Sequence, residues 1–117
     1  MKITLSTLSE ATEQQVFDQV KNHLLTQMEN SILDPDNDIC AYRGVNGLQC
    51  AAGCLMSDEE ATNIIEKTSW YSLSRKGLVP KCHLELINKL QDIHDFENPD
   101  DWANYLQNLA HEHGLTF

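Results

Sequence analysis

Apolar residues recur at helical spacing in two long segments of the chain. The first follows Thr12, which forms a capping box with Gln15, and its apolar positions are Val16, Phe17, Val20, Leu24 and Met28. The second follows Pro80, a residue type favoured at the first position of a helix, and its apolar positions are Leu86, Ile87, Leu90 and Ile93. These patterns predict one helix over residues 13–29 and another from Pro80 to about Phe96.

Two further helices are indicated by their end signals. Ser57 and Glu60 form a second capping box, and the helix that it begins should fade near Thr68. Asn98-Pro99 combines an N-cap residue with proline at the first helical position, and Gly114 supplies the stop signal. The residues of this last helix expected to face inward are Trp102, Tyr105, Leu106 and Leu109.

A hairpin signal interrupts the helical pattern in residues 39–57, which we term the Cys-rich segment. Asn46-Gly47, the dipeptide that best fits a two-residue β-turn, lies there between residues 40–43 and 48–50. Residues 67–81 are predicted to form a loop. The predicted fold class is therefore mostly α (α+β), with four helices packed on a small two-stranded antiparallel β-hairpin. No repeat or linker divides the chain, so residues 1–117 are predicted to form a single domain.

Length and composition restrict the class of protein. A chain of 117 residues can bury a core without disulfides, and four cysteines without a signal peptide indicate reduced thiols in the cytoplasm. No apolar stretch approaches membrane-spanning length, so we expect no membrane association. The formal charge of −10, from 18 acidic and 8 basic residues, opposes general DNA or RNA binding, because the protein's field repels a phosphate backbone.

Several segments together resemble a set of small uncharacterised phage and bacterial proteins. The resemblance covers nearly the whole chain, and the segments that carry it are Cys40-Ala41-Tyr42-Arg43-Gly44, Cys50-Ala51-Ala52-Gly53-Cys54-Leu55, Leu90-Gln91-Asp92-Ile93-His94-Asp95, and the closing Trp102 with Leu109 to Leu115. The resemblance implies a phage-associated context, in which short acidic proteins are often accessories that bind host molecules. The cytoplasm would then be that of the host. The resemblance implies no catalytic residue.

A zinc site is the first hypothesis that the cysteines raise, because thiolates and imidazoles suit tetrahedral zinc. The candidate ligands are Cys40, Cys50, Cys54, Cys82 and His83. They include no C-x-x-C pair, and the predicted hairpin sends Cys40 and Cys50 to opposite faces, where they would neither chelate a metal nor form a disulfide. We therefore expect core cysteines, no metal and no cofactor, with a zinc site as the alternative.

Covalent catalysis by a cysteine and a histidine is a second hypothesis. His94 lies on the apolar stripe of the second long helix, with Asp95 beside it. Adjacent helical residues point about 100° apart, so Asp95 is not expected to orient His94, and no oxyanion-hole signal accompanies a cysteine. A hydrogen-bonded core histidine is the favoured interpretation. The protein is predicted to be non-enzymatic, with a thiol- or metal-dependent hydrolase as a further alternative.

A cationic and aromatic set is the first candidate binding surface. It consists of Trp70, Tyr71, Arg75 and Lys76, joined by Arg43 if the hairpin lies against the predicted loop. Aromatic faces stack on bases and a guanidinium grips phosphate, so this set suits a mononucleotide or a small cyclic nucleotide. The alternative is a solvated loop whose aromatic residues pack on the core.

An acidic set is the second candidate binding surface, with three residues on either side of the predicted hairpin. It consists of Asp34, Asp36, Asp38, Asp58, Glu59 and Glu60. Such a surface could steer association with a basic groove on a host protein, although acidic runs also serve simply as solvated surface. The sequence favours an accessory protein that inhibits or modulates a host factor, such as a defence protein, through this surface. Sequestration of a small (cyclic) nucleotide immune signal is the alternative, and the oligomeric state, a homo-oligomer included, stays open.

Overall fold

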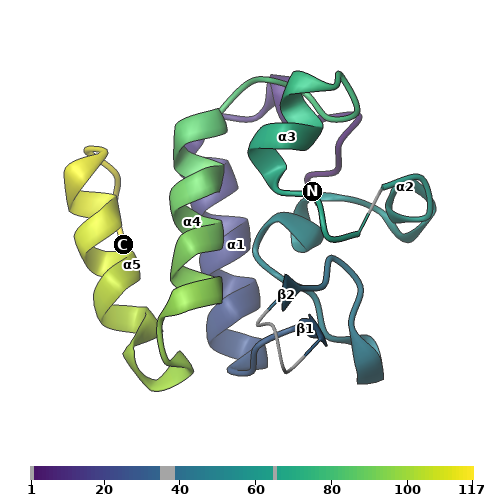
Figure 1. Cartoon of the computed structure of the whole chain (residues 1–117). Helices are drawn as coiled ribbons and strands as arrows, with labels where there is room; N and C mark the ends of the chain where they lie inside the picture. Colours follow the sequence, from purple (N-terminus) through teal and green to yellow (C-terminus); the bar gives the residue numbers. More distant parts are fainter. Residues whose placement is uncertain (1, 35–38, 65) are drawn as a thin grey trace.

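The computed structural model describes residues 2–34, 39–64 and 66–117, and within them the chain forms five α-helices and two very short strands (Figure 1). The helices are α1 (Glu13–Gln27), α2 (Asp58–Ala61), α3 (Trp70–Arg75), α4 (Leu84–Phe96) and α5 (Trp102–Glu112). The strands are β1 (Ile32–Asp34) and β2 (Ile39–Cys40). Short 3-10 turns are η1 (Leu8–Glu10), η2 (Val45–Gly47), η3 (Ala52–Leu55) and η4 (Pro99–Asp101).

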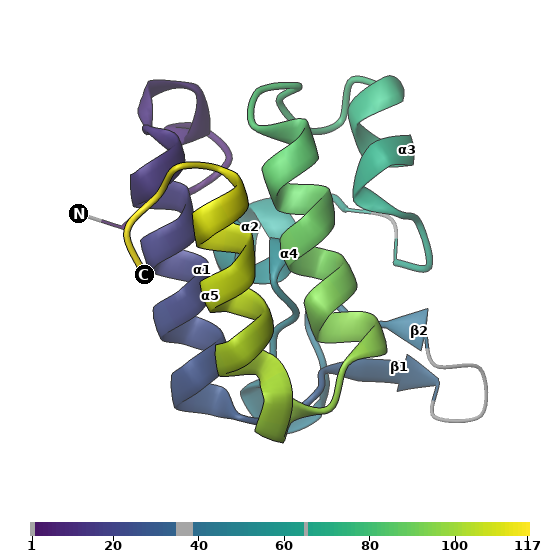
Figure 2. The same ribbon diagram turned by 90° about the vertical axis from the view of Figure 1, so that its left-hand side faces the viewer.

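Three of the helices form the body of the molecule. α1, α4 and α5 contact one another, and Figure 2 shows α5 lying across the outer face of α1 and α4. η3 packs against both α1 and α4, and α3 packs along α4 (Figure 1). The fold is therefore a layer of helices with irregular chain held against it.

The helix ends follow the predicted capping signals closely at two places. The Thr12 hydroxyl accepts a hydrogen bond from Gln15 N (3.1 Å), and the Gln15 amide oxygen accepts one from Thr12 N (2.9 Å). Both groups of the capping box are thus satisfied, and α1 begins at the next residue. The Asn98 side chain accepts from Asp100 N (2.9 Å) ahead of α5, and Gly114 takes the left-handed backbone conformation (φ 67°) just beyond its end.

Two other predicted helix boundaries are wrong. The helix begun by the second capping box, α2, ends at Ala61 rather than near Thr68. α4 begins at Leu84 rather than at Pro80, because His83 has a left-handed backbone (φ 56°) that cannot lie within a regular helix. Sequence signals mark residues that could begin or end a helix. The actual boundary also depends on the backbone conformation of the neighbouring residues.

The predicted hairpin is absent, and the predicted fold of four helices packed on it is wrong. Asn46-Gly47 adopts the left-handed backbone of a tight turn (φ 57° and 79°), but the flanking segments pair elsewhere. Cys40 pairs antiparallel with Ile32, and Gln49 N donates to the Gln27 side chain of α1 (3.0 Å). An Asn-Gly signal reports only the local turn, whereas the flanking backbone groups here bind partners distant in the sequence. The described β-structure is limited to the short pair β1 and β2.

Residues 67–81, predicted to form a loop, contain α3. The Ser69 hydroxyl caps this helix by accepting from Ser72 N (3.1 Å). Trp70 and Leu73, about one helical turn apart, are buried and anchor the helix to the core. A helix this short has little stability of its own, so its formation depends on tertiary packing that the local sequence pattern does not reveal.

One core cluster collects apolar residues from all the longer helices. The predicted stripes are buried except for Met28 and Tyr105, whose side chains are 42% and 41% exposed. The buried members of the stripes are Val16, Phe17, Val20, Leu24, Leu86, Ile87, Leu90, Ile93, Trp102, Leu106 and Leu109. Among the described helices, none has the length and apolar character needed to cross a membrane.

Candidate functional site

Arg43, a predicted ligand-binding residue, is bound to the protein's own chain. Its Nη1 donates to the carbonyl oxygens of Tyr42 (3.0 Å) and Gly53 (2.7 Å), and its Nη2 donates to that of Met56 (2.8 Å). Its Nε lies 3.0 Å from Asp58 Oδ1, in a charge-assisted pair. A guanidinium with these partners holds the surrounding backbone in place rather than presenting its donors to a phosphate.

The two halves of the Cys-rich segment run in direct contact. Tyr42 is buried, and a Cβ on Gly53 would collide with the Tyr42 carbonyl, so glycine is required there. The Glu66 carboxylate accepts from the backbone N–H groups of Tyr42 (3.0 Å) and Arg43 (3.2 Å). Gly53 and the predicted ligand residue Arg43 therefore serve the close packing of the segment itself.

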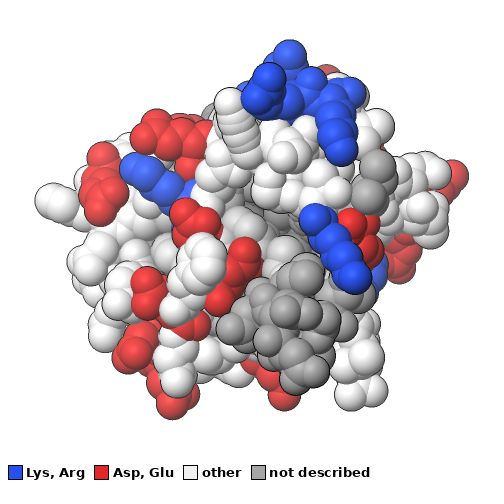
Figure 3. Space-filling view, viewed as in Figure 1, with Lys and Arg blue, Asp and Glu red and all other residues white. Residues whose placement is uncertain are grey.

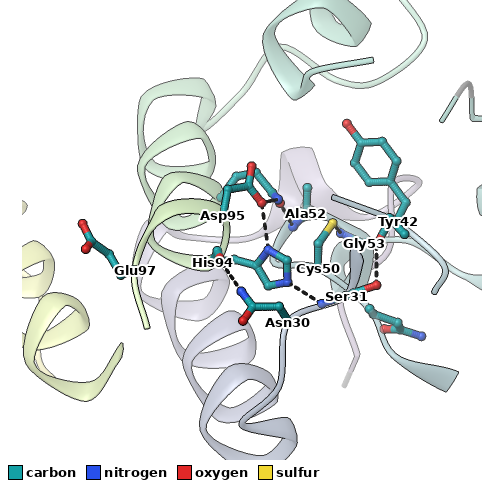
Figure 4. Close-up of polar contacts among 12 residues, drawn as sticks. Asn30, Ser31, Tyr42, Cys50, Ala52, Gly53, His94, Asp95 and Glu97 are labelled. Carbon is teal, nitrogen blue, oxygen red and sulfur yellow. Dashed lines mark hydrogen bonds and ion pairs between the residues drawn. The ribbon is translucent and has the colours of Figure 1, made fainter. Parts of the chain in front are cut away.

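A buried polar network centred on His94 links α4 to the irregular part of the fold (Figure 4). His94 Nδ1 lies 2.8 Å from Asp95 Oδ1, and His94 Nε2 accepts from Ser31 N at 2.9 Å. Because Nε2 is the acceptor, Nδ1 carries the proton and donates to Asp95. Asn30 donates to the His94 carbonyl (2.6 Å), and the Trp102 ring stacks on the imidazole with centroids 5.6 Å apart.

The expectation that Asp95 would not orient His94 is wrong, because the two side chains bend toward each other near the end of α4. Gln91 extends the network by donating to Asp95 Oδ1 (2.7 Å) and accepting from Ala52 N (2.9 Å). Both ring nitrogens of His94 nevertheless hold structural bonds in a buried position, so neither is directed at a thiol as a catalytic base would be. The geometry is that of a hydrogen-bonded core histidine.

All four cysteines are free thiols. Burial holds the pKa of the Cys50 thiol well above its usual range and raises the pKa of Cys54 to about 12, which disfavours the reactive thiolates. The expectation that Cys40 and Cys50 lie on opposite faces of one hairpin does not apply, because Cys40 belongs to β2 and Cys50 lies ahead of η3. That expectation required the hairpin, which does not form. Within the described ranges, no group of three or more His, Cys, Asp or Glu side chains could hold a metal ion.

The cationic and aromatic set is divided between core and surface. Trp70 is only 1% exposed, and its Nε1 finds no hydrogen-bond partner in the described part of the chain. Tyr71 is 44% exposed, and the Arg75 guanidinium carbon lies 5.8 Å from its ring centroid. Arg75 and Lys76, with Ser72, line a hollow of about 330 Å³. Three of the five predicted ligand residues thus share the outer side of α3, and the other two do not join them.

The predicted acidic surface is described only in part. Asp36 and Asp38 lie outside the described residues, and Asp34 is described only as a backbone position of β1. On the other side of the Cys-rich segment, the Asp58 side chain is 93% exposed although it pairs with Arg43. The neighbouring Glu59 is exposed as well.

Glu60, by contrast, is used inside the fold. Its Oε1 accepts from Ser57 N (2.8 Å) and Leu5 N (3.0 Å), and its Oε2 accepts from Ser6 N (3.0 Å). Burial opposes the ionisation of Glu60, but these N–H groups outweigh burial and lower the pKa of Glu60 below its usual value. Glu60 therefore ties the N-terminal segment to α2 and is not a free docking charge.

A different acidic surface lies where α4 ends and α5 begins. We term it the acidic end, and it consists of Asp92, Phe96, Glu97, Asp100, Asp101 and Tyr105. Figure 3 shows Asp and Glu side chains gathered over the lower left of the molecule, where Figure 1 places this helix junction. Lys and Arg side chains gather instead at the top, over α3. No Lys or Arg occurs in the sequence after Lys89.

Phe96 is the unusual member of the acidic end. Its 75% exposure is the highest among the large apolar side chains described. It lies one helical turn after Asp92 on the same face of α4, and it precedes Glu97. Glu97 raises the pKa of Tyr105 through its charge and through a side-chain hydrogen bond, so these two groups are also neighbours. An apolar ring is thus presented to solvent among carboxylates.

Sequence reasoning missed the acidic end. Phe96 continues the apolar spacing of α4, so the pattern gave no reason to separate it from the buried stripe, and Tyr105 was expected to face inward. Two signals could have found the surface. One is the absence of Lys and Arg after Lys89, and the other is an aromatic residue at the end of a helix stripe, where no further turn covers it.

A groove of about 630 Å³ lies between the N-terminal residues and α1. Its polar lining includes Gln19, whose amide binds both the N–H (2.7 Å) and the carbonyl (2.9 Å) of Ile3 and also the carbonyl of Cys54 (2.9 Å). Lys2, Glu10 and Asp18 also line the groove. These mixed charges do not favour any one class of ligand. The groove is therefore a weaker candidate than the acidic end.

The chain matches no protein-family model, no curated protein and no solved structure. The chain is a small helical protein. In the middle of the chain, polar side chains such as Arg43 and Glu66 form hydrogen bonds to the protein's own backbone. The charges and aromatic rings of the acidic end remain exposed.

Proposed function

We propose that this protein is a non-enzymatic accessory protein of phage type, which binds a host protein through the acidic end and thereby inhibits or modulates it. The partner surface is basic and has an apolar hollow that receives a phenyl ring. The observation that carries the proposal is the exposure of Phe96 among carboxylates.

Phe96 supplies the affinity in this proposal. Burial of a phenylalanine side chain contributes about 1.5–3 kcal/mol, or roughly 10- to 100-fold in a dissociation constant. Protein interfaces typically place such an aromatic anchor in a pocket and surround it with a polar rim that excludes water. In this proposal the exposed acids Asp92, Asp100 and Asp101 supply the polar rim.

The charges supply the association rate and the choice of partner. The formal charge of the chain is −10, and opposite charge on a partner raises the rate of productive encounter. Salt screens such steering because the Debye length is about 8 Å at physiological ionic strength. A basic protein surface is therefore favoured as the partner, whereas a nucleic acid or an acidic protein would be repelled.

The alternatives have less support from the geometry. Nucleotide sequestration was expected to use Trp70 for stacking and Arg43 for phosphate, but the first side chain packs in the core and the second bonds to backbone carbonyls. A thiol hydrolase would need an accessible nucleophile beside a free base, but Cys50 is buried and both nitrogens of His94 are engaged. The phage resemblance supports a host protein as the partner.

A comparative pull-down tests the proposal. The tagged chain is incubated with lysate of a bacterium that is host to phages carrying such proteins, and retained proteins are identified by mass spectrometry. Phe96→Ser should lose the specific partner, with an affinity loss of roughly 10-fold or more. The combined change Asp92→Asn, Asp100→Asn and Asp101→Asn should lower the association rate with the purified partner and weaken its dependence on salt.

The matched control is the double change Arg75→Ala and Lys76→Ala, which alters the opposite, basic side of the molecule. It should retain the partner. A partner held equally well by Phe96→Ser and by the triple Asn variant would contradict the proposal, and so would a partner lost only with the α3 control.

A further inference from the structure

The side of the molecule over α3 carries positive charge that no neighbouring acid neutralises. Its cations are Lys67, Arg75, Lys76 and Lys81, and all four are exposed. The sequence contains no Asp or Glu in residues 67–84. Within the described ranges, none of the four cations forms an ion pair. We term this surface the basic side, and it stands out in a chain whose formal charge is −10.

The basic side also exposes apolar and aromatic groups. The exposed fractions of Tyr71 and Leu78 are 44% and 42%. Arg75 and Lys76, with Ser72, line the hollow of about 330 Å³. The Arg75 guanidinium carbon lies 5.8 Å from the Tyr71 ring centroid. An aromatic side chain that enters the hollow can therefore stack on a guanidinium, which is a favourable cation–π contact.

The acidic end is complementary to the basic side in charge and in shape of side chain. Asp92, Asp100 and Asp101 are exposed and form no ion pair in the part of the chain that the structure describes. Phe96 adds an exposed ring. Figures 1 and 2 show α3 beside the first half of α4, whereas Phe96 is the last residue of that helix. A single copy therefore cannot bring its own two surfaces together.

We propose that the basic side receives the acidic end of a second copy of this chain, with Phe96 in the hollow beside Arg75 and the carboxylates facing the cations. The contact is head-to-tail, so every bound pair leaves one acidic end and one basic side free, and further copies can add. The inference rests on the proposed function for the role of the acidic end. It adds a regulation of that surface, because self-association covers Phe96 and a host partner has to displace the second copy.

The net charge limits the strength of this contact. Two copies of charge −10 repel each other at long range. The Debye length is about 8 Å at physiological ionic strength, whereas the molecule measures 32 × 32 × 24 Å, so most of the like charges are screened from each other and the facing opposite charges are not. We expect a weak contact with a dissociation constant of roughly 0.1–1 mM, in the range of small transient interfaces.

The first test is sedimentation of the purified wild-type chain at physiological ionic strength. The average mass should rise with concentration over about 0.01–1 mM. Phe96→Ser and the double change Arg75→Ala and Lys76→Ala each remove one of the two surfaces, and each variant alone should stay monomeric. Phe117→Ser is the matched control, because it removes an exposed ring outside the acidic end, and it should associate as the wild type does.

Mixing the two defective variants tests the head-to-tail arrangement. Phe96→Ser retains the basic side, and the double α3 variant retains the acidic end, so an equimolar mixture should associate again. The complex should stop at a dimer, because both remaining surfaces are defective. The triple change Asp92→Asn, Asp100→Asn and Asp101→Asn replaces Phe96→Ser in a second mixture and guards against a variant that folds poorly.

The proposal is overturned if the wild type stays monomeric up to about 1 mM. It is also overturned if the wild type associates but neither mixture does, since like surfaces would then be paired. A monomeric wild type that binds phosphatidylserine vesicles through Arg75 and Lys76 would assign the basic side to a membrane instead. These measurements contain no host protein, so they can fail while the pull-down of a host partner succeeds, and the reverse.

Discussion

The middle of the chain, residues 39–76, and the acidic end use similar side chains in opposite ways. In the middle of the chain, Arg43 donates to backbone carbonyls, and Trp70 is buried in the core. In the acidic end, Phe96 is exposed, and Asp100 and Asp101 lie at the surface. A charged or aromatic residue therefore marks a binding surface only where the fold leaves it without an internal role.

The contrast has a physical cause. The middle of the chain has little regular structure, so its backbone N–H and C=O groups need partners that a helix would have supplied, and side chains such as Arg43 and Glu66 provide them. The acidic end lies where α4 ends and α5 begins, and the backbone groups of this junction find partners in Asn98, which accepts from Asp100 N, and in Trp102, whose Nε1 donates to the Glu97 carbonyl. Its side chains are consequently available for a partner.

The largest difference between the two regions should appear when their aromatic residues are removed. Trp70→Ala should lower the free energy of unfolding by about 3–5 kcal/mol, because it leaves a cavity in the core. Phe96→Ala should change it by no more than about 0.5 kcal/mol, because the ring is mostly in water already. Urea denaturation of both variants provides the measurement. Equal losses would mean that the two rings are not differently packed.

The next effect concerns the two arginines. Arg43→Ala should cost about 2–4 kcal/mol, because the carbonyls of Gly53 and Met56 lose a charged donor in a partly buried place. Arg75→Ala removes the same side chain from the surface of α3 and should cost less than about 0.5 kcal/mol. Thermal and urea denaturation of the two variants measure these losses. If Arg43→Ala were as stable as the wild type, the Arg43 side chain would not be needed for folding and would again be a candidate for ligand binding.

The smallest effect concerns carboxylates and depends on pH. The pKa of Glu60 is lowered in the folded protein, so its stabilisation is present above the usual value of 4.5 and is lost as the pH falls through the folded-state pKa. Glu60→Gln should therefore cost about 1 kcal/mol at pH 7, and this cost should shrink as the pH is lowered toward 3. Asp101→Asn in the acidic end is the control and should show no comparable loss at pH 7. A pH-independent cost for Glu60→Gln would show that the charge of Glu60 is not what stabilises the fold.

The sequence by itself determined the elements whose signals are local. The capping box of Thr12 and Gln15 fixed the start of α1, because all of its hydrogen bonds lie within four residues. The stripe of Leu86, Ile87 and Leu90 located α4, since helical spacing alone directs these side chains to one face. The N-cap at Asn98 marked the approach to α5 for the same reason.

Only the tertiary structure decided which charged and aromatic side chains remain exposed for a partner and which are used inside the fold. The bonds from Arg43 to the carbonyls of Gly53 and Met56 and the bond from Ser31 to His94 join groups 10 to 63 residues apart. No local pattern encodes such pairs, because they depend on which backbone groups lack partners once the helices have packed. The same packing covers Trp70 and leaves Phe96 in water, although both are large aromatic residues.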